Sequence, residues 1–279
     1  MIVKINGVLE DLNSVLKYNM KKYYLFLLII IIGTLFNCAG KKIQFEDELV
    51  ANYNKALKFF NNGKYVRAKD EFQYIIMTDP GSKIANESQY YKAEALFLMK
   101  EYEESWDAFD QYIRFTNDIE KIEKSRFRIC ECAIASTNFY QRDQKQTIRA
   151  VEQLQMFLED FPNSELIQDA EKEITELRNK LARKEYEVGR LYLKLEEYES
   201  ALIYFRSVLN NYYDTNFADD ARIGIIFTHI LNENRKGAKN YYKAEKNRFI
   251  NIKKELEAKS LIKDTEKGLS LNHYFQLYK

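Results

Sequence analysis

Three windows of this 279-residue sequence repeat one pattern without a gap, and this repetition constrains the fold more than any other feature. Each window has a small residue, an apolar residue three positions later, a tyrosine, a second small residue and a phenylalanine. The windows cover residues 56–72, 93–109 and 189–205. Small residues let two antiparallel helices cross closely, and aromatic residues fill the space between one helix pair and the next. The pattern therefore predicts stacked helix pairs.

This pattern resembles the tetratricopeptide repeat (TPR), a helix-turn-helix unit of about 34 residues. We predict an all-α fold, a tetratricopeptide-repeat superhelix of about five helix-turn-helix repeats within residues 49–255. The repeats are expected at about residues 49–80, 86–118, 126–162, 164–215 and 216–255. The chain has only 2 prolines and 9 glycines, which disfavours a β-sandwich. Both prolines, Pro80 and Pro162, fall where a second helix should end.

The fourth and fifth repeats carry further helix signals. Apolar residues recur in steps of three and four through residues 164–195, which predicts one long helix. A separate coiled coil is the weaker alternative, because it would have only about four heptads. In the fifth repeat we expect Asn216 to cap the first helix and Asp219 to lie in its positive first turn. Residues 256–279 are expected to form a C-terminal tail, and its last part, residues 270–279, to cap the last repeat or dock a partner.

The one strongly apolar run, residues 23–36, is too short for a membrane-spanning helix, which needs about 20 residues. Lys21 and Lys22 precede it directly, as in a signal peptide. Met20 comes just before them, so we interpret residues 1–19 as an over-extended start. Residues 1–37 would then be removed from the mature protein.

The apolar run ends at Cys38 in a sequence that resembles a bacterial lipobox. We expect Cys38 to carry a covalent lipid and residues 38–48 to form the lipidated N-terminus and a tether. Two or more acyl chains anchor a protein stably to a membrane. The alternative is an ordinary cleaved signal peptide followed by a thiol without a role.

Charge and motif content argue against several functions. The 43 basic residues nearly balance the 42 acidic ones, so no overall field favours nucleic acid as a partner. The only histidines, His229 and His273, lack metal-ligand spacing, and no catalytic or phosphate-binding motif is present. We therefore predict no enzyme activity, no catalytic residue, no metal and no cofactor besides the lipid at Cys38. Cys130 and Cys132 are interpreted as buried small residues rather than a redox pair.

Residues 142–215 resemble the third and fourth repeats of the BamD family, lipoproteins of the β-barrel assembly machinery. The marks are Arg142-Asp143, Pro162-Asn163-Ser164, Leu181-Ala182, Glu185-Tyr186 and Tyr192. The resemblance extends over about residues 38–250. Tyr213 departs from it by standing where the family commonly has proline, Phe36-Asn37 make the lipobox loose, and the tail beyond Glu255 is unfamiliar.

The resemblance implies a lipid-anchored scaffold on the periplasmic face of the outer membrane. Its implied partners are a BamA-type barrel subunit, other assembly lipoproteins and unfolded outer-membrane proteins, whose insertion it would promote. The alternative function is that of another TPR-containing envelope lipoprotein, such as a pilus-secretin assembly factor or a cell-division coordinator.

Client binding is expected on the first helices of the N-terminal repeats. When the small residues of repeats one and two are aligned in sequence, Tyr53 and Tyr90 stand at equivalent positions, and so do Phe60 and Phe97. These four aromatic residues could stack on the aromatic end of an unfolded barrel protein. The alternative is that all four simply fill the core between repeats.

Docking of the BamA-type subunit is expected on the C-terminal half. The candidate contacts are basic residues: Arg206, Arg235, Lys239, Lys243 and Lys246. They could fix the register of an acidic partner surface. The alternative is a solvated helix face.

Overall fold

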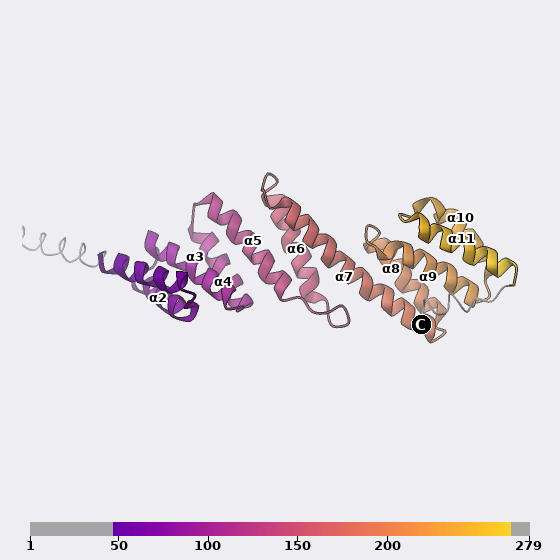
Figure 1. The fold of residues 1–279 in the computed structure, drawn as a ribbon, viewed down its shortest axis with the longest axis horizontal. Helices are drawn as coiled ribbons and strands as arrows, with labels where there is room; N and C mark the ends of the chain where they lie inside the picture. The colour runs from indigo at the N-terminus through magenta and orange to yellow at the C-terminus, as the bar shows by residue number, and fades with distance from the viewer. Residues whose placement is uncertain (1–46, 269–279) are drawn as a thin grey trace, which may run out of the picture. The chain divides into compact units, whose positions relative to one another are not determined.

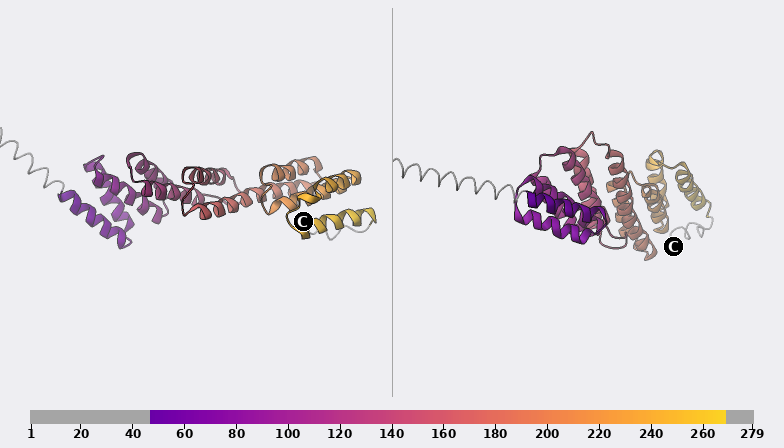
Figure 2. Two further views of the ribbon diagram at one scale, coloured as in Figure 1. Left: turned by 90° about the horizontal axis from the view of Figure 1, so that it is seen from above. Right: turned by 60° about the vertical axis from the view of Figure 1, so that its left-hand side comes forward.

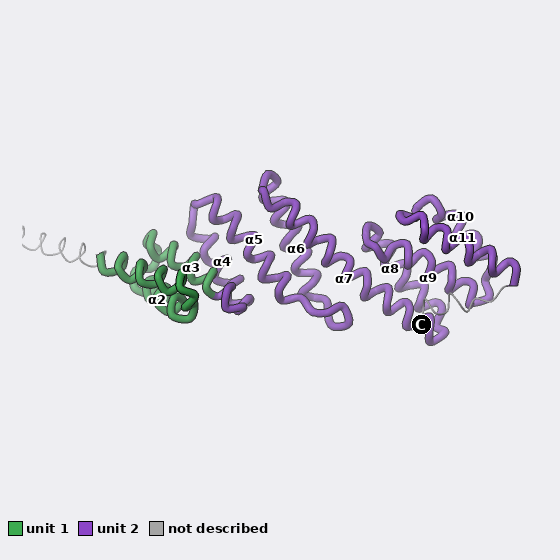
Figure 3. Tube along the Cα trace, in the orientation of Figure 1, with its two compact units in different colours: residues 1–95 green, residues 96–279 purple. Residues whose placement is uncertain are grey.

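The computed structural model describes residues 47–268, and every regular element in that range is helical (Figure 1). The predicted all-α fold is therefore confirmed. The chain divides into two compact units, residues 1–95 and residues 96–279 (Figure 3). The predicted signal peptide, Cys38 and the end of the predicted tail lie outside the described residues. Within 47–268, no helix combines the length and the apolar composition that a membrane crossing needs.

Unit 1 contains one helical hairpin and most of a third helix. Residues 47–61 are helical, α2 covers Tyr65–Thr78, and α3 covers Lys83–Leu98 and runs past the unit boundary. The small residues Ala56 and Ala68 are fully buried together with Phe72. This burial confirms that the repeated small and aromatic positions form the helix crossing.

Unit 2 continues with consecutive helices that pack side by side (Figures 1 and 2). They are α4 (Tyr102–Phe115), α5 (Ile119–Ala135), α6 (Lys145–Asp160), α7 (Ile167–Lys194), α8 (Tyr198–Asn211), α9 (Phe217–Leu231), α10 (Arg235–Glu245), the short 3-10 helix η1 (Lys246–Arg248) and α11 (Ile252–Glu266). Helices α2 and α6 end two residues before Pro80 and Pro162, as predicted.

Four turns within repeats share one backbone geometry. In the first of them, the Lys64 N–H donates to the Phe59 carbonyl at 2.9 Å and the Gly63 N–H to the Phe60 carbonyl at 2.9 Å. These two bonds are the Schellman arrangement that ends a helix, with one residue in the left-handed region. That residue is Gly63, Lys100, Glu196 or Glu233, with φ of 72°, 64°, 60° and 55° respectively. The second helix begins two residues later in each case.

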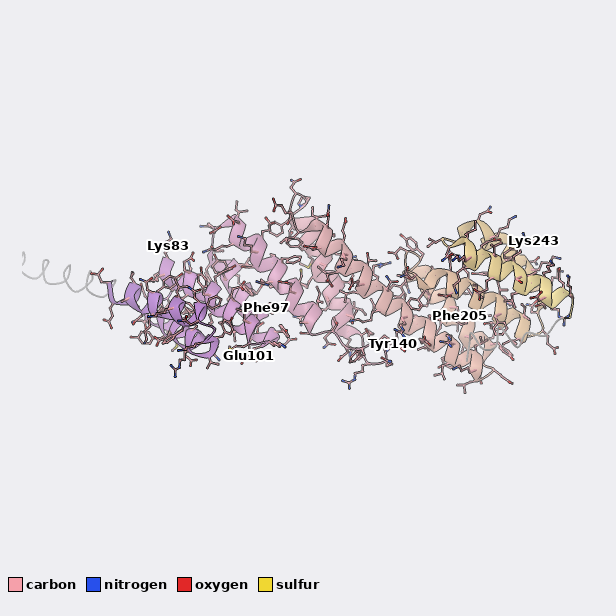
Figure 4. The ribbon with its side chains drawn as sticks, in the orientation of Figure 1. Lys83, Phe97, Glu101, Tyr140, Phe205 and Lys243 are labelled. Atoms are coloured by element: carbon pink, nitrogen blue, oxygen red, sulfur yellow. The ribbon has the colours of Figure 1, made fainter. Side chains whose placement is uncertain are left out.

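The ring of Phe205 on α8 lies close to the backbones of both α7 and α9. A Cβ atom added to Gly189 of α7 would lie 2.8 Å from Cε1 of this ring, and one added to Gly224 of α9 would lie 2.8 Å from Cζ. Phe205 itself is fully buried and is labelled in Figure 4. The two glycines are therefore required by the close contact of α7 and α9 with one aromatic ring.

Helix α7 takes part in two hydrophobic cores. Its N-terminal half contributes Ala170 and Leu177 to a core with α5 and α6, whereas its C-terminal half contributes Tyr186 and Leu193 to a core with α8 and α9. The long helix predicted over residues 164–195 is confirmed, with observed bounds of Ile167–Lys194. The coiled-coil alternative is wrong, because both halves pack against other helices of the same chain.

The C-terminal region differs from the prediction in two respects. First, α11 crosses residue 255, where we expected the superhelix to give way to a tail, and it packs on α9 and α10. Second, Asn216 stands at the N-cap of α9 without a side-chain cap bond. Its backbone N–H instead donates to Oδ1 of Asn179 at 2.9 Å.

Asp219 does more than complement the helix dipole. Its buried carboxylate accepts the Ile250 N–H at 2.9 Å and the Asn251 N–H at 2.7 Å, and it pairs with Arg222 at 3.0 Å. Arg222 also contacts Glu245 at 3.3 Å. This network fixes the segment between α10 and α11 on α9.

Candidate binding surfaces

The predicted client residues of unit 1 belong to an aromatic cluster around Tyr91. The Tyr53 ring lies 6.3 Å from the Tyr91 ring, the Phe60 ring 5.6 Å and the Tyr90 ring 5.5 Å. Tyr53 also contacts Phe72 at 6.0 Å. Burial raises the pKa of the Tyr53 phenol above its usual value. These rings are half-buried, so they pack against one another and keep part of their surface accessible.

Phe97, the fourth predicted client residue, lines a cavity of about 390 Å³ in unit 2. Phe127 and Ile134 of α5 complete its apolar wall. The Arg128 guanidinium carbon lies 4.6 Å from the centre of the Phe97 ring, and Arg128 pairs with Glu131 at 2.8 Å. The charged residues that line the cavity are Glu131 of α5 and three residues of α7, Asp169, Lys172 and Glu173. The cavity can accept an apolar or aromatic side chain between charged edges.

Sequence reasoning missed Phe127, although a signal for it exists. Tyr53, Tyr90 and Phe127 follow one another at 37 residues (90 − 53 = 37 and 127 − 90 = 37). The register of the first two repeats therefore extends to α5. Phe127 could have been found by carrying that spacing into the third repeat, where it also places the small, buried Cys130 at the position of Ala56 and Ala93.

Arg206 of α8 lines a second cavity, of about 690 Å³, with Arg222, Tyr241, Glu245 and Arg248. Glu245 is already bonded to both other arginines, at 3.3 Å to Arg222 and 2.9 Å to Arg248. Arg206 is exposed and has no ion pair among the described residues. The buried hydroxyl of Tyr241 has no hydrogen-bond partner in the structure. Burial raises the pKa of this phenol, so the hydroxyl keeps its proton and can donate.

The other predicted docking residues lie on a different surface. Four exposed basic residues on α10 and η1 do not line the Arg206 cavity: Arg235, Lys239, Lys243 and Lys246. Lys239 pairs with Glu266 of α11 at 2.6 Å. Figure 4 shows Lys243 on α10, well separated from Phe97 within unit 2. The structure therefore brings Arg206 together with Arg248 rather than with the lysines.

The possible metal ligands and the cysteines of residues 47–268 were the remaining candidates for chemistry. No cluster of three or more metal-binding side chains occurs in this range. Cys130 and Cys132 are both buried and free, as predicted. Burial raises the pKa of the Cys130 thiol to about 12, which keeps it protonated and unreactive.

The fold is that of a tetratricopeptide-repeat protein. Its helices are paired with small residues at their crossings, its turns within repeats share the Schellman geometry, and cavities lie between its helices. Residues 46–247 match the model of the YfiO family, described as an outer membrane lipoprotein. The chain therefore belongs to the YfiO family, and the predicted relationship to BamD is confirmed.

Two relatives illustrate the relationship. The outer membrane protein assembly factor BamD of Rickettsia prowazekii is 26% identical over 230 residues, which cover 80% of this chain and 90% of the relative. BamD of Caulobacter vibrioides is 23% identical over 216 residues, or 75% of this chain and 71% of the relative. Among solved structures, the TPR2AB domain of yeast Sti1 has a TM-score of 0.35 at 12% identity, over 79% of this chain and 99% of that domain.

Proposed function

We propose that this protein is an assembly factor for outer membrane proteins. It is held on the periplasmic face of the outer membrane by a lipid on Cys38, binds unfolded outer-membrane proteins and docks a BamA-type barrel subunit. The observation that carries the proposal is the family match over residues 46–247, because relatives of this chain are named outer membrane protein assembly factors. A repeat scaffold that presents half-buried aromatic rings and exposed basic side chains suits such a binding role.

Client binding is proposed at the Phe97 cavity and, separately, at the aromatic cluster of unit 1. Phe97 and Phe127 offer aromatic surface inside a cavity of a size that fits a side chain. In unit 1, partly accessible rings are offered by half-buried Tyr53 and Phe60 of the first helix and by half-buried Tyr90 of α3.

The test uses a fluorescein-labelled peptide that ends in an aromatic residue and copies a terminal barrel strand. Binding to the full chain is followed by fluorescence anisotropy. We expect Phe97→Ala combined with Phe127→Ala to weaken binding by at least about tenfold. Tyr53→Ala combined with Tyr90→Ala tests the unit 1 cluster in the same way. Phe115→Ala, an exposed phenylalanine outside both surfaces, is the matched control. Unchanged affinity in both double variants would place client recognition elsewhere.

Partner docking is proposed at the Arg206 cavity. Arg206 is exposed and has no ion pair among the described residues, so the cavity suits an acidic side chain of the partner. We expect Arg206→Glu to abolish co-purification of the BamA-type subunit. The pair Lys239→Glu and Lys243→Glu reverses charge on the separate α10 surface. If only that pair prevented co-purification, docking would lie on α10 rather than at the cavity.

The lipid anchor is tested by palmitate labelling of the expressed protein. We expect label in the wild type and none in Cys38→Ser. An unlabelled wild type would exclude the anchor without affecting the two binding proposals.

A further inference from the structure

One connection breaks the geometry of the repeats. Turns within the other described repeats use three residues, such as residues 99–101 between α3 and α4. Between α5 and α6 the chain instead uses the nine residues 136–144. Binding functions are common in loops on a rigid scaffold, and especially in a loop that departs from the turn geometry of the other repeats.

This loop, residues 136–144, is held in one conformation by buried and charged groups. The Gln144 side chain, only 7% exposed, donates to the carbonyls of Phe139 at 2.8 Å and Arg142 at 3.0 Å, and accepts from Thr147 at 2.8 Å. From α7, Lys184 donates to the Arg142 carbonyl at 2.5 Å. A loop braced in this way loses little conformational entropy when a partner binds.

The braced loop presents aromatic surface to solvent. Phe139 is 80% exposed, which leaves a large apolar side chain without a packing partner on most of its surface. The guanidinium carbon of Arg183 on α7 lies 4.1 Å from the centre of the Tyr140 ring. Together with Phe217 of α9, these residues line a cavity of about 600 Å³ between the loop and α7. Tyr140 is labelled in Figure 4.

The charges around this cavity are unbalanced. Arg142, Lys180 and Arg183 line it, against the single carboxylate of Glu176. Lys180 donates to the Thr137 hydroxyl at 2.8 Å, and burial lowers its pKa. The guanidinium groups of Arg142 and Arg183 make no ion pair within the described residues. The Arg183 guanidinium lies over the Tyr140 ring, and its N–H groups are free of ion pairs with the described residues, so they can donate to a carboxylate.

We propose that the cavity beneath loop 136–144 binds an acidic peptide segment of a partner protein. A carboxylate of the segment pairs with the edge of Arg183, Arg142 adds a second cation, and an apolar side chain of the segment packs on Phe139. Arginine and aromatic anchors of this kind dominate protein interfaces. A lipid headgroup is disfavoured, because the cations lie in a recess beside a projecting phenylalanine rather than on a flat basic surface.

The test measures fluorescence anisotropy of a short labelled peptide that carries aspartate and leucine in a glycine-serine background. Binding to the full chain should be detectable and should weaken as salt is added. Arg183→Glu and Phe139→Ser, each made separately, should weaken binding at least about tenfold. Arg67→Glu, which reverses an exposed arginine of α2, is the matched control and should bind as the wild type does. Far-UV circular dichroism and thermal midpoints verify that the variants remain folded.

Three results would overturn the proposal. The first is equal peptide affinity for the wild type, Arg183→Glu and Phe139→Ser. The second is equal affinity of the wild type for a peptide in which serine replaces every aspartate. The third is loss of binding to phosphatidylglycerol vesicles in Arg183→Glu without any loss of peptide binding, which would identify a lipid-headgroup site. The client peptide of the preceding section serves as an independent reference, because its binding should survive both substitutions.

Discussion

Placing a methyl group against the Phe205 ring tests the packing of α7, α8 and α9 directly. Replacing glycine by alanine inside a helix normally stabilises a protein by about 0.5–1 kcal/mol. Here the new Cβ would lie 2.8 Å from a ring atom in either Gly189→Ala or Gly224→Ala, closer than carbon atoms approach without repulsion. Overpacking of this kind costs roughly 1–3 kcal/mol. We therefore expect each variant to lose about 1–2 kcal/mol of unfolding free energy.

The effects of the two substitutions should not be additive. Both added methyl groups would contact the same atoms of the Phe205 ring, Cδ1, Cε1 and Cζ, so a shift of the ring at one site changes the contact at the other. Coupling between contacting sites is typically about 0.5–3 kcal/mol. Urea unfolding followed by circular dichroism measures each loss, and the Phe205→Leu background is the control. In that background the clash is removed, so both alanine substitutions should become neutral or stabilising. Higher stability of either single variant in the wild-type background would refute the close-contact argument.

Three further predictions concern buried and ionised groups. Asp219→Ala should lower the free energy of unfolding, measured in urea, by about 3–5 kcal/mol, because the buried Arg222 and two backbone N–H groups lose their acceptor. A loss no larger than that of a substitution at an exposed residue would contradict this. Cys130, with a pKa of about 12, should react with iodoacetamide at mildly alkaline pH only after unfolding, as mass spectrometry of the alkylated protein can show. The hydrogen bond from Arg178 lowers the pKa of the Asp214 carboxyl in the folded protein. The ionised carboxylate therefore stabilises the fold at pH values above the pKa of an unfolded aspartate, about 3.9, and this stabilisation is lost as the pH falls through the lower pKa of the folded state. Because the pair is partly exposed, Asp214→Asn should remove less than about 1 kcal/mol of this acid-dependent stability, and an unchanged stability-versus-pH curve would exclude the contribution.

Local sequence patterns predicted most of the fold. The apolar recurrence along residues 164–195 predicted α7 because a helix that buries one face must repeat apolar residues every three or four positions. Ala68 and Gly189 could be assigned to helix crossings, since each stands at the same position of a repeated window. The end of the helical array could not be predicted, because α11 has no counterpart in the repeats and is rich in lysine.

The candidate surfaces were less predictable because they depend on residues distant in sequence. Arg183 meets Tyr140 across 43 residues (183 − 140 = 43), and no periodic pattern links them. Asp219 could be recognised as a residue of the first helical turn, but its bonds to the backbone of residues 250–251 depend on how α11 packs. Phe97 was recognised from its place in the repeat, whereas the cavity around it required the position of α5.

The continuity of α7 has a consequence for how unit 2 loses its structure. A straight helix of 28 residues is about 42 Å long, and its two halves belong to different cores. Neither core can melt completely without exposing half of a helix whose other half remains packed. The shared helix therefore joins the two cores into one cooperative unit, in which opening near α5 and α6 is opposed by packing against α8 and α9. A repeat array with only short helices would instead open pair by pair.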